Sequence, residues 1–170
     1  SRIMPAKGKG FEQSYNAQAA VDTESMLIVA TTMAQVATDK QQVEPMLKVI
    51  TQLPEELGSV ENLLTDNGYF SAANVEHCLQ ANIEPLLAAG RDKHHPHWED
   101  RFTEPPALAE PASEVDRMKH RLKTIQGRKL YGLRKQTVEP VFGIIKSVMG
   151  FRQFLLRGLD SVRGEWNLVT

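Results

Sequence analysis

The sequence predicts a mixed α/β domain, because its hydrophobic residues follow two different periods in different stretches. Residues 15–21 alternate with the period of two that is typical of a β-strand. Residues 43–53 and 138–149 carry apolar side chains at the three- and four-residue spacing of a helix that packs on one side. The chain has 170 residues, of which 41% are hydrophobic, so it is long enough for one domain with a core.

A β-hairpin and a helix are the first elements expected. Residues 15–21 and 26–30 form its two strands, and the segment between them is rich in turn residues. Thr38 and Asp39 offer oxygens that could cap a helix, and apolar residues at helical spacing then continue over residues 44–53.

A strand–helix–strand unit follows. Residues 60–65 form a short apolar strand that ends at the turn sequence Asp66-Asn67-Gly68. Ser71 is a capping residue for a helix to about Gln80, and residues 83–88 form the next strand. Such a unit predicts that the two strands are parallel.

The last part of the chain contains an irregular stretch and two helices. Residues 90–113 have four prolines and no sustained period, which indicates a loop insertion. A helix begins near Ser113, and another starts before Val138, runs to about Met149 and stops at Gly150. The order of elements matches an RNase H-like fold, a mixed sheet with flanking helices, without its first catalytic strand.

Charge is distributed unevenly along the chain, although the net charge is only −1. Residues 1–116 contain 8 Lys and Arg against 18 Asp and Glu, whereas residues 117–163 contain 12 against 2. A solvated helix face would explain a short basic run, but a balance of +10 over 47 residues favours an anionic partner such as nucleic acid. Arg152 and Arg157, with aromatic residues near them, suit a DNA backbone.

Asp66 is the first candidate for a chemical role, because it directly follows an apolar strand. Functional groups in open α/β sheets concentrate beyond the carboxyl ends of the strands. The triplet Asp66-Asn67-Gly68 is also an ordinary turn sequence, so position alone leaves a purely structural role open.

Glu139 is the second candidate, and it lies beside the apolar stripe of the last long helix. On a regular helix, Glu139, Gly143 and Lys146 share a face, on which the acid and the amine could serve one metal-bound phosphate. A solvent-facing pair of Lys135 with Glu139 explains the local pattern as well.

Three segments together resemble the catalytic domain of bacterial insertion-sequence DDE transposases: GFEQSYNAQAAVDTESMLIVA, LLTDNGYFS and YGLRKQTVEPVFGIIKSVMGFRQFLLRGLDSVRGEWNLV. In the last segment Tyr131, Arg134, Glu139 and Lys146 fall close to the Tyr-Arg-Glu-Lys pattern of that family. The family leaves three residues between the Arg and the Glu, whereas four lie between Arg134 and Glu139. Either a loop has one extra residue here, or Lys135 takes the place of the arginine. Tyr131, Arg134, Lys135 and Lys146 are the residues of this segment that we expect to contact DNA.

The resemblance implies an RNase H-like domain in which two aspartates and a glutamate hold two divalent metals. Asp66 and Glu139 correspond to the second and third acids. Hard oxygen ligands suit Mg²⁺ or Mn²⁺, and two such ions roughly 4 Å apart clamp an in-line displacement at a DNA phosphate. Asp22 lies too late in the chain for the first acid, so we expect that acid upstream of Ser1 and a fragment that is inactive alone.

The expected function is therefore that of part of a transposase, which cleaves DNA and transfers strands when an insertion sequence moves. In this interpretation residues 1–170 are a partial catalytic domain that acts on element ends and target DNA, as a homodimer in the full-length protein. A cytoplasmic, nucleoid-associated location and no membrane partner are expected. A non-catalytic DNA-binding remnant of a decayed mobile element, or another RNase H-like nuclease, is the alternative.

Three histidines and the single cysteine complete the candidates. His94, His95 and His97 could indicate a metal site, but they fall in a Pro-rich stretch with no cysteine near them, which disfavours one. Cys78 is expected to be a buried helix residue. Phe154 and Trp166 are expected to pack in the core.

Overall fold

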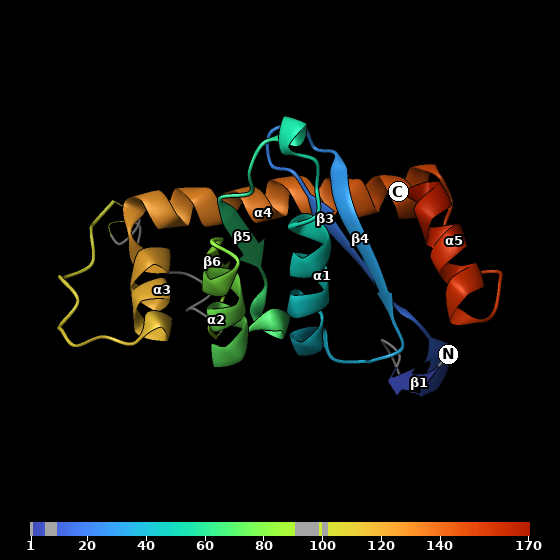
Figure 1. Cartoon of the computed structure of the whole chain (residues 1–170), viewed down its shortest axis with the longest axis horizontal. Helices are drawn as coiled ribbons and strands as arrows, with labels where there is room; N and C mark the ends of the chain where they lie inside the picture. Colours follow the sequence, from blue (N-terminus) through green and yellow to red (C-terminus); the bar gives the residue numbers. More distant parts are fainter. Residues whose placement is uncertain (1, 6–9, 91–98, 100–101) are drawn as a thin grey trace. The chain divides into compact units, whose positions relative to one another are not determined.

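The computed structural model describes residues 2–5, 10–90, 99 and 102–170 (Figure 1). Contacts divide the chain into two compact units. Unit 1 comprises residues 1–52 and 135–170, and unit 2 comprises residues 53–134. The two units are described separately below.

The described residues of unit 1 form two antiparallel strand pairs. These are β1 (Arg2–Pro5) with β2 (Phe11–Ser14), and β3 (Asn16–Val21) with β4 (Ile28–Ala34). In the turn after β3, the carboxylate of Asp22 accepts hydrogen bonds from the backbone N–H and the hydroxyl of Ser25. These bonds lower the pKa of Asp22. The hairpin predicted over residues 15–30 is confirmed, and the β1–β2 pair is a separate two-stranded sheet that the sequence did not predict.

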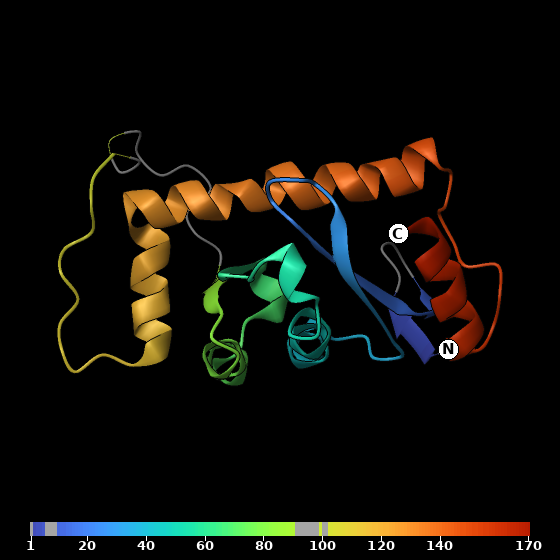
Figure 2. The same cartoon turned by 45° about the horizontal axis from the view of Figure 1, so that its top comes forward.

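Helix α1 (Val43–Ile50) packs against β4, as Figure 2 shows, and buries Val43, Met46, Leu47 and Ile50. The predicted capping was wrong, because neither Thr38 nor Asp39 caps a helix with its side chain. The carboxylate of Asp39 instead accepts hydrogen bonds from the side-chain amides of Asn16 (2.9 Å) and Gln18 (3.1 Å). The Asp39 carboxylate, which the sequence pattern assigned to a helix cap, therefore bonds to polar side chains of β3 instead.

Helix α4 (Ile125–Gly143) starts in unit 2 and ends in unit 1. It continues through Pro140, which supplies no backbone N–H to the residue four positions earlier. A π-helical turn, Ile144–Val148, follows, and the N–H of Met149 donates to the carbonyl oxygen of Ile144, five residues back. Gly150 has a φ of 71° and ends the helix where the sequence predicted.

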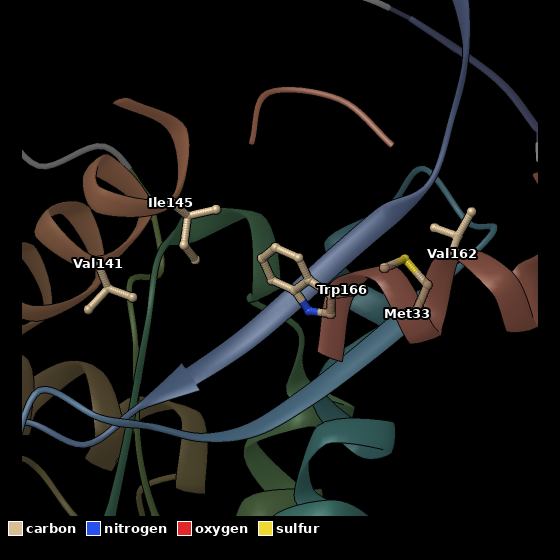
Figure 3. Close-up of a cluster of buried hydrophobic side chains, with 5 residues drawn as sticks. All are labelled: Met33, Val141, Ile145, Val162 and Trp166. Atoms are coloured by element: carbon tan, nitrogen blue, oxygen red, sulfur yellow. The ribbon is translucent and has the colours of Figure 1, made fainter. Parts of the chain in front are cut away.

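The core of unit 1 joins β4, the end of α4 and helix α5 (Leu159–Val169). Figure 3 shows its five buried side chains: Met33, Val141, Ile145, Val162 and Trp166. The indole N–H of Trp166 donates to the carbonyl oxygen of Gln18 at 3.1 Å, which satisfies its one polar group. The core role expected for Trp166 is confirmed, and Phe154 packs against this cluster.

Unit 2 is built on a strand–helix–strand motif. Strand β5 (Asn62–Thr65), helix α2 (Ala72–Gln80) and strand β6 (Glu84–Leu87) follow one another, and the two strands are parallel as predicted. The hydroxyl of Ser71 accepts a hydrogen bond from the N–H of Asn74 and caps α2, also as predicted. Val75, Cys78, Leu86 and Leu87 are buried with almost no exposed surface.

Helix α3 (Glu114–Lys123) begins where the sequence predicts, and the structure adds a cap, because the hydroxyl of Ser113 accepts a hydrogen bond from the N–H of Asp116. The chain turns at Thr124, whose hydroxyl donates to the carbonyl oxygen of Arg121 and accepts from the N–H of Gly127. Arg121 also pairs with Glu84 at 2.8 Å, which ties α3 to β6. Residues 102–113, within the segment interpreted as a loop insertion, contain no helix or strand.

The α/β class is confirmed. Within the described ranges, however, the strands pair in three two-stranded sheets, β1–β2, β3–β4 and β5–β6. The prediction of one mixed RNase H-like sheet thus goes beyond the pairing that the hydrogen bonds establish.

Candidate functional site

Asp66 lies in an exposed turn directly after β5. Its carboxylate accepts a hydrogen bond from the N–H of Gly68 at 2.8 Å, and the turn from Asn67 to Tyr69 is a 3₁₀ helix. Asn74, which is buried, donates its side-chain amide to the carbonyl oxygen of Tyr69 at 2.6 Å. The first bond holds the Asp66 carboxylate at the carboxyl end of β5, and the second holds the far end of the turn that follows it.

Tyr131 on α4 holds the strand end that precedes this turn. Its hydroxyl donates to the carbonyl oxygen of Thr65, the residue before Asp66, at 3.0 Å. The guanidinium of Arg134 lies over the Tyr131 ring, 5.7 Å from its centroid. Two residues of the Tyr-Arg-Glu-Lys pattern therefore lie together, and one of them fixes the strand end that bears Asp66.

Glu139 is an exposed residue near the end of α4. Residues 125–143 form a continuous α-helix, so the alternative of an extra loop residue between Arg134 and Glu139 was wrong. Lys135, also exposed, precedes Glu139 by one helical turn and shares its face. Among the described residues no ion pair joins Lys135 to Glu139.

The shared face expected for Glu139, Gly143 and Lys146 assumes regular α-helical geometry. The π-helical turn at Ile144–Val148 interrupts that geometry after Gly143. The amine of Lys146 lies over the ring of Phe142, 5.5 Å from its centroid.

Three of the predicted DNA-contacting residues meet at a hollow of about 730 Å³ in unit 1. Lys146, Arg152 and Arg157 line it, together with aromatic residues of the core and the backbone between β2 and β3. Arg152 and Arg157 are exposed and belong to a segment that we call the arginine loop, Gly150–Gly158. The structure thus groups these three cations, in a unit that contains neither Asp66 nor Tyr131.

Several residues that position this region gave no recognisable signal in the sequence. Glu165 on α5 accepts hydrogen bonds from the N–H groups of Leu155 and Leu156. The hydroxyl of Tyr15 accepts one from the N–H of Gly158. These contacts join residues 9 to 143 positions apart, beyond the reach of any local spacing rule.

Part of the basic segment is neutralised by carboxylates. Arg117 pairs with Glu110 and Glu114, Arg121 with Glu84, and Arg163 with Asp160. The +10 balance over residues 117–163 therefore overstates the charge available to an anionic partner. Arg152, Arg157 and Lys146 take part in none of these pairs.

A family model for the transposase DDE domain matches residues 2–170. The chain belongs to the transposase DDE domain family. A search of curated proteins finds no match to it. Transposases act on DNA, and DDE transposases generally use divalent metal ions such as Mg²⁺.

The donor chemistry of this DDE domain fits such ions. Asp66 and Glu139 are exposed carboxylates, the hard oxygen ligands that Mg²⁺ and Mn²⁺ take. Within the part of the chain that the structure describes, no three His, Cys, Asp or Glu side chains gather in one cluster. His94, His95 and His97 lie outside the described residues.

No helix in the described part of this DDE domain has both the length and the apolar character needed to cross a membrane.

Proposed function

We propose that this chain supplies the second and third acidic residues, Asp66 and Glu139, for metal-dependent DNA cleavage and strand transfer during transposition of an insertion sequence. The observation that carries the proposal is the brace between Tyr131 and the strand end at Asp66. It joins two motifs that are far apart in the sequence but belong to one catalytic pattern in the family that the chain resembles. The bond supports the proposal because it fixes the strand end from which Asp66 projects.

In this proposal, Asp66 and Glu139 offer carboxylate oxygens to divalent metal ions. Bound there, the ions would activate the attacking oxygen and stabilise the leaving one at a DNA phosphate. The turn around Asp66 holds its carboxylate in place before any ion binds, because Gly68 donates to one of its oxygens. Two carboxylates would leave a pair of cations under-coordinated, so residues 1–170 by themselves are proposed to be inactive.

The cationic residues contact DNA phosphates in this proposal. Arg134 or Lys135 acts near Glu139, with Lys135 favoured because it lies on the same helical face. Lys146, Arg152 and Arg157 act at the hollow of unit 1. Tyr131 positions the strand end next to Asp66, because its hydroxyl donates a hydrogen bond to the carbonyl oxygen of Thr65. We further propose an RNase H-like arrangement of the strands and a homodimer on DNA in the full-length protein.

The test is strand cleavage of DNA that contains the element end, by the full-length protein in Mg²⁺ or Mn²⁺. Asp66→Asn and Glu139→Gln keep the shape of each side chain and remove its charge. Both are expected to abolish cleavage and to leave DNA binding nearly unchanged. Asp160→Asn, at a residue whose side chain is 96% exposed, is the matched control and should cleave normally.

Full activity of Asp66→Asn would show that Asp66 is only a turn residue and would overturn the assignment. DNA binding by the unmodified full-length protein with no cleavage in either metal would instead favour a non-catalytic remnant of a mobile element.

A further inference from the structure

The arginine loop is held by contacts at its ends and at its centre. Gly150 and Gly158 bound it with φ values of 71° and 90°, which other residues rarely adopt. Near the first end, the N–H of Phe151 donates to the carbonyl oxygen of Ile145 at 3.0 Å. At the second end, the N–H of Gly158 donates to the hydroxyl of Tyr15 at 3.1 Å.

The centre of the loop is held by Glu165, beside the packing of Phe154 against the core of unit 1. One of its carboxylate oxygens lies 2.9 Å from the backbone nitrogen of Leu155, and the other lies 3.1 Å from the nitrogens of both Leu155 and Leu156. Hydrogen bonds to an ionised acceptor are about twice as strong as neutral ones. Both leucine side chains point largely into solvent, with exposed fractions of 76% and 52%, so they add little packing of their own.

The negative charge of Glu165 disfavours the binding of an anionic partner at the hollow of unit 1. The residues that it holds adjoin Arg157, and they line the same hollow as Lys146 and Arg152. A carboxylate beside a DNA-binding surface repels phosphate, so by charge alone its removal would tighten DNA binding.

We propose that Glu165 is a positioning residue for DNA binding, which fixes the arginine loop so that Arg152 and Arg157 stay at the hollow. This inference rests on the proposed function, in that the ligand of the hollow is the DNA backbone. Holding the two guanidinium groups in place before DNA arrives reduces the ordering cost of binding. In this proposal, the lower ordering cost favours DNA binding more than the Glu165 carboxylate disfavours it by repulsion, because both carboxylate oxygens already accept hydrogen bonds from N–H groups.

Three variants separate positioning from charge. Glu165→Leu removes the charge and the acceptor oxygens, whereas Glu165→Gln removes the charge and keeps one oxygen acceptor. Asp160→Asn removes one charge from the same helix, at a residue that pairs with Arg163, outside the arginine loop.

The measurement is the Kd for a short DNA duplex at two salt concentrations, with the fold checked by circular dichroism. Glu165→Leu is expected to weaken binding about tenfold, the loss of roughly one charge-assisted hydrogen bond. Glu165→Gln should lie between Glu165→Leu and the unmodified protein, and Asp160→Asn should bind as tightly as the unmodified protein or more tightly. If both Glu165 variants tighten binding as Asp160→Asn does, Glu165 acts only through its charge and the inference is overturned.

Hydrogen exchange tests the same contact without DNA. The amides of Leu155 and Leu156 should be protected in the unmodified protein and should exchange faster in Glu165→Gln, even if Glu165→Leu does not fold. Unprotected amides in the unmodified protein would overturn the positioning role. If the amides are protected but the unmodified protein shows no salt-dependent DNA binding, the loop contact stands and the proposed DNA function fails.

Discussion

The hydroxyl of Tyr131 lies 3.0 Å from the carbonyl oxygen of Thr65 and donates a hydrogen bond to it, across 66 positions of sequence. Thr65 ends strand β5, and Asp66 follows it. The bond therefore sets the direction in which the chain leaves the strand and, with it, where the Asp66 carboxylate lies.

Replacement of Tyr131 by Phe should affect catalysis more than stability. Removal of one hydrogen bond should lower the free energy of unfolding by about 1 kcal/mol. Strand cleavage by the full-length protein should fall about tenfold or more, because small displacements of a catalytic group are costly. DNA affinity should stay the same. Tyr131→Leu also removes the ring under Arg134, so a larger loss of DNA affinity in that variant would separate the ring from the hydroxyl.

DNA binding should depend on salt through the arginine loop. Each phosphate contact that is lost reduces the slope of log affinity against log salt by about 0.9 for duplex DNA. Replacement of both Arg152 and Arg157 by Ala should therefore reduce the slope by about 2. Replacement of Arg117 and Arg163 by Ala is the matched control and should change the slope less, because both residues pair with carboxylates. An equal reduction in the two double variants would remove the arginine loop from the DNA surface.

Two glycines of α4 should respond to alanine in opposite ways. A Cβ on Gly127 would collide with the backbone carbonyl of Arg121, whereas a Cβ on Gly132 would meet nothing within 4 Å. Gly132→Ala should raise the free energy of unfolding by up to about 1 kcal/mol, because alanine has the higher helix propensity. Gly127→Ala should lower it by roughly 1–3 kcal/mol, as overpacking does. Urea denaturation of both variants measures the difference, and stabilisation by Gly127→Ala would contradict the close approach.

The thiol of Cys78 should be unreactive while the protein is folded. Burial raises its pKa from the usual value near 9 to about 12, because the thiolate would lie among apolar groups. At pH 8 a thiol-specific disulfide reagent should therefore react only as fast as the protein unfolds. Between about pH 9 and pH 12 the unfolded chain releases this proton and the folded chain keeps it, so stability should fall as the pH rises. Cys78→Ala should reduce this alkaline loss of stability, and rapid labelling of the folded protein would contradict the burial.

The sequence predicted elements whose signals are local. The predictions that hold are the β3–β4 hairpin, the parallel β5–α2–β6 unit, the cap at Ser71, the start of a helix near Ser113 and the end of the long helix near Gly150. Each follows from period, turn residues or capping residues. Helix α5 was not predicted, because Gly164 lies inside it and its buried residues, Val162 and Trp166, are too few for a clear helical stripe. Asp39 was misassigned because its partners, Asn16 and Gln18, lie more than twenty residues away.

In the candidate site, too, features with a local sequence signal could be predicted and long-range contacts could not. The position of Asp66 at a strand end and the positive charge at Arg152 and Arg157 could be predicted, since a strand end and a run of charge are visible in the sequence. The brace from Tyr131 and the hold of Glu165 could not, because they join backbone atoms to side chains from remote elements. The π-helical turn that contains Lys146 could not be predicted either, since a hydrophobic stripe drawn at 3.6 residues per turn assumes the regular helix that this turn interrupts.

Unit 1 is discontinuous in sequence, and this sets an order for folding during synthesis. Its core needs Trp166 against the hairpin that holds Gln18, 148 residues earlier. Translation adds about 5–20 residues each second. All residues of unit 2 therefore leave the ribosome before residues 135–170, which unit 1 needs. Until then the apolar face of the β3–β4 hairpin has no α5 to cover it, so the nascent chain is expected to bind holding chaperones through that hairpin.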